Sequence, residues 1–245
     1  MARPMTVQDL TADVQRALGG RLVSLLLYGS AARGGGPGAG GDALTRADTL
    51  LICDAVDEAL LGALEPVIAR WVRQGEPGPL IMTHAEWREA ADAFPIEYDD
   101  IRHGHRLLAG QDPWAGIAVR RDDLRRQLEH ELRGKVVRLR QVYAAFRGDG
   151  TRLAEAIAAT LAGFLTMLRA ALRLAGHEVP SVGADVVRAG GAVAGFDPAP
   201  VVDLLARLRG PQAGRLAPRD PRAAAYLRAV TRTAEFVNRV SVTRD

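Results

Sequence analysis

The sequence predicts an α+β protein, with a mixed sheet and flanking helices in residues 1–118 and an all-helical bundle in residues 119–245. Short β-rich runs alternate with helical patterns through the first part of the chain. From Asp122 onward the strand signal disappears, and apolar residues recur every three or four positions. The length of 245 residues fits one large domain or two small ones, each with a core that needs no disulfide.

In the first part, each element follows from a local pattern. Apolar runs predict strands at residues 22–28, 49–53 and 80–82, and amphipathic spacing predicts helices at residues 6–18 and 54–73. Thr83, with Glu86 three positions on, has the form of a capping box, so a short helix is expected to begin there. Residues 94–101 alternate apolar and acidic side chains, which predicts a strand with Glu97 and Asp99 on one face.

The second part shows only helical spacing. Leucines and other apolar residues step by three and four from Leu124 to Phe146, which predicts one long helix from Asp122. Further helices are expected at residues 151–175, 184–193, 200–209 and 221–240. No repeat of solenoid length interrupts this pattern, so the prediction is a bundle.

The composition is that of a soluble protein, with 48% hydrophobic and 25% charged residues and a net charge of +3. The single cysteine, Cys53, lies in an apolar run, which excludes an intrachain disulfide and predicts a buried structural thiol. No apolar run reaches the length of about 18 residues that a membrane span needs. We therefore expect a cytoplasmic protein with no membrane partner.

The stretch SLLLYGSAARGGG, which begins at Ser24, raises the first functional question. A Gly29-Ser30 turn after a buried strand lets backbone amides and one hydroxyl approach phosphate oxygens closely, because glycine has no side chain to block them. The alternative is a plain corner between a strand and a helix. The glycine-rich residues 34–41 that follow predict a mobile loop.

These residues resemble the GSxARG…DxD pattern of the nucleotidyltransferase superfamily, which has a polymerase-beta-type fold. The residues that match are Gly29, Ser30, Ala32, Arg33, Gly34 and Asp48. The segment FPIEYDDIRHGHRLLAGQDPW also resembles the part that supplies a third carboxylate in bacterial kanamycin-nucleotidyltransferase-like proteins. Those proteins too carry a helical bundle behind the catalytic sheet.

The resemblance implies a transferase that moves a nucleoside monophosphate from ATP or another nucleoside triphosphate to the hydroxyl of a small molecule. Gly29, Ser30 and Arg33 would then hold the phosphates, and Asp48 would hold magnesium. Glu97 would be either a further magnesium ligand or the base that deprotonates the acceptor. Partial burial between Ile96 and Tyr98 is expected to raise the pKa of Glu97, as a base requires.

The sequence departs from the pattern at the paired acidic positions. Depending on the register, the partner of Asp48 is Arg46 or Leu50, so one carboxylate is missing. Unit charges about 4 Å apart at an effective dielectric of 20 interact by ~4 kcal/mol, so a guanidinium beside a divalent ion costs roughly twice that. Such a cost argues against a two-metal site.

Three explanations of the missing carboxylate stay open. Asp42 in the glycine-rich loop could replace it, at the entropic cost of ordering that loop. Arg46 could hold the triphosphate itself, because arginine matches phosphate oxygens bidentately. Catalysis could also be lost, which would leave a pseudoenzyme that acts as a nucleotide sensor or as an interaction scaffold for a protein partner.

Two other groups of residues are weaker candidates. His103 and His105 have a spacing that can suit a metal, but without a third ligand nearby they are interpreted as a surface pair. The arginines between Arg120 and Arg147 form either a solvated helix face or a surface that attracts phosphates. Because no aromatic residues are interleaved with them, nucleic acid is not favoured as a partner.

Overall fold

The computed structural model describes residues 3–33, 47–210 and 214–241, and in it the chain divides into two units. The sheet unit comprises Met1–Ala93 and Asp100–Ala118, and the bundle unit comprises Phe94–Asp99 and Val119–Asp245. The division therefore differs from the predicted limits of 1–118 and 119–245 only in the short segment Phe94–Asp99.

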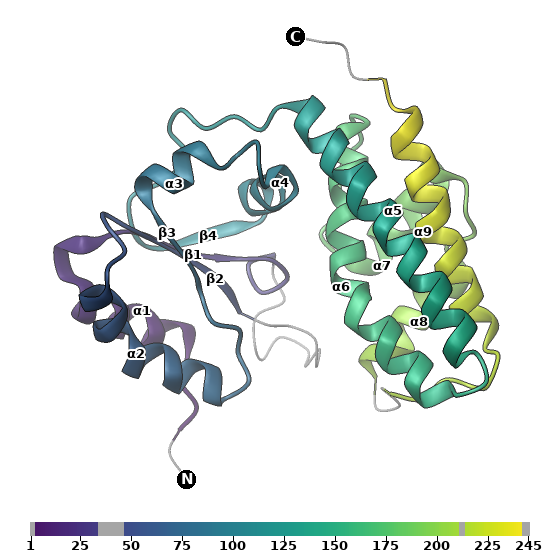
Figure 1. The fold of residues 1–245 in the computed structure, drawn as a ribbon, viewed down its shortest axis with the longest axis horizontal. Coiled ribbons are helices and arrows are strands. Elements are labelled where there is room, and N and C mark those ends of the chain that lie inside the picture. Colours follow the sequence, from purple (N-terminus) through teal and green to yellow (C-terminus); the bar gives the residue numbers. More distant parts are fainter. Residues whose placement is uncertain (1–2, 34–46, 211–213, 242–245) are drawn as a thin grey trace. The chain divides into compact units, whose positions relative to one another are not determined.

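Among the described residues of the sheet unit, four strands pair in the order β3-β2-β1-β4 (Figure 1). The same residues form three complete α-helices and one short 3-10 helix, η1 (Gly19–Arg21). β1 is antiparallel to β2 and to β4, whereas β3 is parallel to β2, which confirms a mixed sheet. The strands are β1 (Leu22–Tyr28), β2 (Asp48–Cys53), β3 (Leu80–Thr83) and β4 (His105–Gly110). The helices are α1 (Val7–Leu18), α2 (Glu58–Arg73) and α3 (His84–Glu89).

One face of the sheet carries the core of this unit. Leu25, Leu27 and Leu51 belong to one buried cluster with apolar residues of α1 and α2. These two helices lie on one side of the sheet in Figure 1. Their neighbours Leu26 and Leu50 point to the opposite face and are equally buried, because successive side chains of a strand alternate. The central strands are therefore apolar on both faces, which explains why their sequence is a continuous apolar run.

The only cysteine lies at the end of β2, inside this core. Cys53 is fully buried, and burial raises the pKa of its thiol to about 11. The prediction of a buried structural thiol is confirmed. A protonated thiol without access to solvent is a poor nucleophile, so Cys53 contributes packing and not chemistry.

The starts of the helices follow from their caps. Thr83 forms the predicted capping box with Glu86, and Thr6 forms another with Asp9. α2 begins at Glu58, four residues later than predicted, because the Asp57 carboxylate accepts a hydrogen bond from the Leu60 amide at 2.7 Å. A capping carboxylate at that position fixes the first turn of the helix.

The predicted strand at residues 94–101 is wrong, because this segment forms helix α4 (Pro95–His103). Pro95 is the first helical residue, where its fixed φ and missing amide are favourable. Ile96, Tyr98 and Ile101 are buried, but so are Asp99 and Asp100. Apolar and polar residues are therefore not separated onto two faces of the helix, and the sequence lacks the helical period of apolar residues. The fourth strand, β4, follows this helix and was not predicted.

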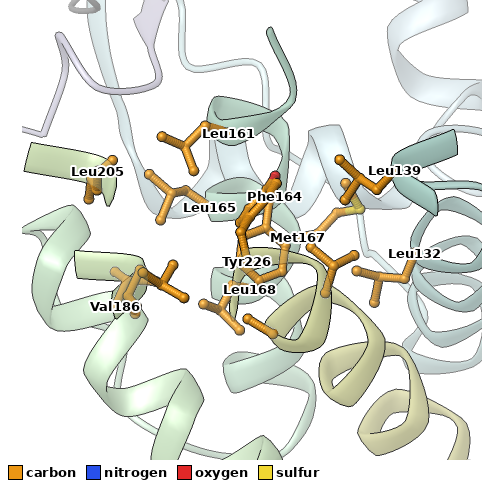
Figure 2. Close-up of a cluster of buried hydrophobic side chains, with 14 of the residues drawn as sticks. Leu132, Leu139, Leu161, Phe164, Leu165, Met167, Leu168, Val186, Leu205 and Tyr226 are labelled. Carbon is orange, nitrogen blue, oxygen red and sulfur yellow. The ribbon is translucent and has the colours of Figure 1, made fainter. Parts of the chain in front are cut away.

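The bundle unit confirms each of the predicted helices to within one residue at either end. Its helices are α5 (Arg121–Phe146), α6 (Gly150–Leu174), α7 (Gly183–Ala194), α8 (Ala199–Arg209) and α9 (Pro221–Arg239). Figure 2 shows their shared core, in which the Phe164 and Tyr226 rings meet edge to face at 5.5 Å. Residues of all five helices contribute to it.

α6 is long and apolar enough to cross a membrane by length and composition alone. Most of its apolar window is buried against the other helices of the bundle, however, and its residues Leu161, Phe164, Leu165 and Leu168 lie at the centre of Figure 2. The core helix of a soluble bundle has these same properties. The structure is consistent with a soluble protein.

The carboxylate that caps α9 predicts a pH dependence of the bundle's stability. Asp220 is buried and accepts hydrogen bonds from the Arg222 side chain at 2.7 and 2.9 Å. These bonds, the largest effect, lower its pKa from 3.8 to about 2. Since the folded pKa lies below the unfolded value, this stabilisation is complete above pH 4 and is lost as the pH falls towards 2.

We expect Asp220→Asn to lower the free energy of unfolding by about 2 kcal/mol near neutral pH and by almost nothing at about pH 2. Urea denaturation followed by far-UV circular dichroism measures both values. Asp185→Asn is the control, because that carboxylate forms an exposed pair with Arg188. A difference between wild type and Asp220→Asn that does not shrink at low pH would contradict the assignment.

Candidate nucleotide-binding site

The turn that follows β1 lies against the first residue of β2. Tyr28, the last residue of β1, pairs in register with Asp48. Gly29 then turns the chain with a φ of +74°, and a Cβ atom at this position would lie 2.9 Å from Asp48 Oδ2. Asp48 and the Gly29-Ser30 turn are thus neighbours at one end of the sheet, and Ser30 is exposed there.

The second acidic position of the pattern is closed to a carboxylate. Leu50, two residues after Asp48 and on the same face of β2, is fully buried. A charged side chain in that environment would carry a large desolvation penalty. Asp42 and Arg46, the two substitutes considered from the sequence, and Gly34 lie outside the described residues.

Arg33, at the end of the same turn, is held in an internal ion pair. Its guanidinium pairs with Asp100 of α4, and the two side chains are only 13% and 8% exposed. The guanidinium also lies directly on the backbone of Gly104, where a Cβ atom would come within 2.5 Å of Arg33 Nε. In this conformation Arg33 anchors the turn to the segment before β4 and does not extend from it.

His105, which the sequence suggested only as one of a surface pair with His103, is a further candidate at this site. It pairs in register with Tyr28 on β4, so His105, Tyr28 and Asp48 form a row across three adjacent strands. Its Nδ1 lies 2.8 Å from the Ile101 carbonyl oxygen, so Nδ1 carries the proton, and the lone pair of the neutral ring is on Nε2. The ring packs at 5.8 Å against Trp114. His105 is half-buried and His103 is exposed, so the two histidines have different surroundings.

The structure does not give Glu97 the surroundings expected from the sequence. Glu97 is on helix α4, and its exposed carboxylate accepts a long 3.4 Å hydrogen bond from Gln127 of α5. Residues that are two positions apart in a helix lie about 200° apart around its axis. Glu97 and Asp99 therefore do not share a face of α4. The argument for a raised pKa of Glu97 therefore fails, because it depended on burial.

Asp99 instead belongs to a buried ion pair of the bundle unit. Arg173 of α6 donates a hydrogen bond from Nε to Asp99 Oδ2 at 2.7 Å, and both side chains are less than 15% exposed. Within the described residues, no group of three or more histidine, cysteine or acidic side chains could hold a metal ion. Asp48 belongs to the sheet unit and Glu97 to the bundle unit.

Three of the six arginines of α5 pair with acidic side chains along their own helix. Glu129 pairs with both Arg125 and Arg133, and Asp123 pairs with Arg126. Such exposed pairs contribute little to stability but neutralise much of the positive charge. This arrangement favours the solvated helix face over a surface that attracts phosphates.

Comparison with protein-family models and with curated proteins gives no match for this chain. The site is therefore defined by its geometry. It consists of a glycine turn with positive φ, one carboxylate directly over that turn and an adjacent exposed serine. Chemically, this arrangement can bind an anion through the turn and one divalent cation through the carboxylate.

Proposed function

We propose that the sheet unit is nucleotidyltransferase-like and binds a nucleoside triphosphate, such as ATP, at the turn formed by Gly29 and Ser30. The proposal is supported above all by the position of Asp48 Oδ2 over Gly29, which brings an acidic side chain to the glycine turn of the GSxARG pattern. A cytoplasmic location, where nucleoside triphosphates are abundant, is part of this proposal.

A single magnesium ion fits the described residues of this site, and a pair of ions does not. Magnesium is commonly bound through one or two carboxylates together with substrate phosphates, and Asp48 is one such carboxylate. Leu50 fills the place of a second. When bound, magnesium would neutralise negative charge on the phosphates. Ser30 and the turn amides would orient the phosphate chain, and Arg33 would keep the turn in place through Asp100.

The proposed reaction is transfer of the nucleoside monophosphate to the hydroxyl of a small-molecule acceptor. The chain's own contribution is to position the phosphates at the turn. The proton of the acceptor needs a base, and the sequence suggested Glu97 for this role. His105 Nε2 is a second candidate, because its lone pair is fixed by the hydrogen bond at Nδ1 and it belongs to the same unit as the turn.

A catalytically inactive nucleotide sensor is the second candidate function. Leu50 in the second acidic position favours it, because the two-metal arrangement cannot be built around this residue. On this alternative the sheet unit binds a nucleotide without turnover, and a protein partner responds to the bound state.

Calorimetry with ATP, with and without magnesium, tests the proposal. We expect magnesium to strengthen binding, and Asp48→Asn to weaken it at least about tenfold in the presence of magnesium, because a charged ligand to the ion is lost. Asp92→Asn is the control, since it removes an exposed carboxylate of the same unit and should leave affinity unchanged. The absence of ATP binding by the wild type would refute the proposal.

Release of pyrophosphate from ATP in the presence of hydroxyl-bearing acceptors separates the two candidate functions. A transferase releases pyrophosphate only with a suitable acceptor, and a sensor binds ATP but releases none. Binding that ignores magnesium and is abolished by Arg46→Ala would favour the sensor. Glu97→Gln and His105→Gln then compare the two candidate bases, because only loss of the base lowers turnover with ATP affinity unchanged.

A further inference from the structure

A second concave site lies wholly within the bundle unit and does not depend on the proposed function. Its cavity of about 200 Å³ opens between the connection from α7 to α8 and one face of α9. Phe196 and Pro200 line one side, and Arg228 and Arg232 line the other. Ala225, which is buried, contributes to the lining from α9.

Local backbone geometry shapes this cavity. Gly195 ends α7 in the left-handed conformation, with φ 76° and ψ 46°, and the chain reverses there. The Gly195 and Phe196 amides both donate to the Gly191 carbonyl, which fixes the position of the Phe196 ring next to the bundle core. Ala225 has a short side chain, so the space beside it stays open. The walls are therefore parts of packed helices and their caps.

The charge at the cavity is positive and only partly compensated. Arg228 and Arg232 are one helical turn apart, which places both guanidinium groups on one face of α9. Arg228 forms no ion pair with any residue that the structure describes. Arg232 pairs with Glu235, but both side chains are exposed, so the pair contributes little free energy. Asp197 also lines the cavity, so two arginines stand there against one carboxylate, which accepts a hydrogen bond from the Ala199 amide at the start of α8.

We propose that this cavity binds a small organic anion that consists of one carboxylate attached to a flat apolar group. The guanidinium of Arg228 offers the planar pair of donors that matches a carboxylate. Phe196, Pro200 and Ala225 offer an apolar surface for the rest of the molecule. The volume of about 200 Å³ suits a ligand with a single ring, because cavities for larger ligands measure about 300–1,000 Å³.

Benzoate is the probe, and benzamide is its control, because the two have nearly the same shape and only benzoate is charged. Amide chemical shifts of the full-length protein are recorded as each compound is added. We expect saturable changes at Gly195 and Ala225 with benzoate, with a dissociation constant in the millimolar range that is usual for a ligand of this size. Benzamide should bind at least about tenfold more weakly.

Two variants test the role of Arg228. Arg228→Gln should weaken benzoate binding about tenfold and leave benzamide binding unchanged. Arg239→Gln removes an equal charge from the same helix outside the cavity and should change neither. The proposal is overturned if benzoate causes no saturable change, if it binds no better than benzamide, or if both variants weaken it equally. The shift pattern of each variant without ligand verifies that the bundle is folded.

Discussion

Replacing Arg173 by methionine is expected to lower the free energy of unfolding of the bundle unit by about 3 kcal/mol. The guanidinium of Arg173 lies 2.5 to 2.7 Å from Asp99 Oδ2, and the two side chains are only 14% and 8% exposed. Methionine keeps the apolar stem but removes the charge, so the buried carboxylate loses its cation. Breaking a buried pair from one side is costly because the other charge stays buried.

The measurement must distinguish the two units. All three tryptophans belong to the sheet unit, so tryptophan fluorescence follows that unit, whereas far-UV circular dichroism follows the helices of both. We expect the loss of stability in the circular dichroism signal and not in the fluorescence. Arg188→Met is the matched control, because its pair with Asp185 is exposed and should change stability by less than about 0.5 kcal/mol.

A double variant separates loss of charge pairing from loss of packing. Arg173→Met combined with Asp99→Leu removes both charges, and we expect it to be more stable than Arg173→Met alone. Equal losses for Arg173→Met and Arg188→Met, or a double variant that is less stable than the single one, would show that the ion pair does not hold this part of the bundle.

Gly29→Ala should destabilise the sheet unit by about 2 kcal/mol and abolish the proposed magnesium-dependent binding of ATP. Two effects combine here. The φ of +74° is unfavourable for any residue with a Cβ atom, and that atom would lie 2.9 Å from Asp48 Oδ2. The Asp48 carboxylate, the acidic ligand of the proposed site, must therefore shift away from the turn.

Gly116→Ala isolates the first of these effects. Gly116 belongs to the same unit and has a nearly identical φ of +75°, but a Cβ atom there would meet nothing within 4 Å. We expect Gly116→Ala to cost only the backbone strain, about 1 kcal/mol, and to leave ATP affinity unchanged. If the two variants have the same stability and the same ATP affinity, the contact between Gly29 and Asp48 contributes neither to stability nor to ATP binding.

Most of the secondary structure could be predicted because it depends on local signals. The helices of the bundle carry an uninterrupted apolar period, and the central strands carry continuous apolar runs. The segment that became α4 could not be assigned in this way. Ile96 packs into the core of the bundle unit, whereas Asp100 pairs with Arg33 of the sheet unit, so contacts distant in sequence decide its surroundings.

The candidate site was partly predictable for a related reason. The pairing of a glycine turn with Asp48 follows from two strands that are consecutive in the chain, and the structure places these residues together. The environment of Arg33 depends on a partner 67 residues away, and no local pattern indicates it. The position of His105 beside Tyr28 depends on the register of β4. The sequence of this strand, HRLLAG, has too few apolar residues to predict a strand.

The way α4 is divided between the units has a practical consequence for anyone who wishes to produce them as separate polypeptides. A fragment ending at residue 118 would carry Ile96 and Asp99 without the leucines and the Arg173 that surround them in the intact chain. The complementary fragment would retain Arg173 without this counter-ion. Neither half is expected to reach its native stability, and a circular permutant or a duplicated copy of residues 94–99 would be needed to supply the missing turn of helix.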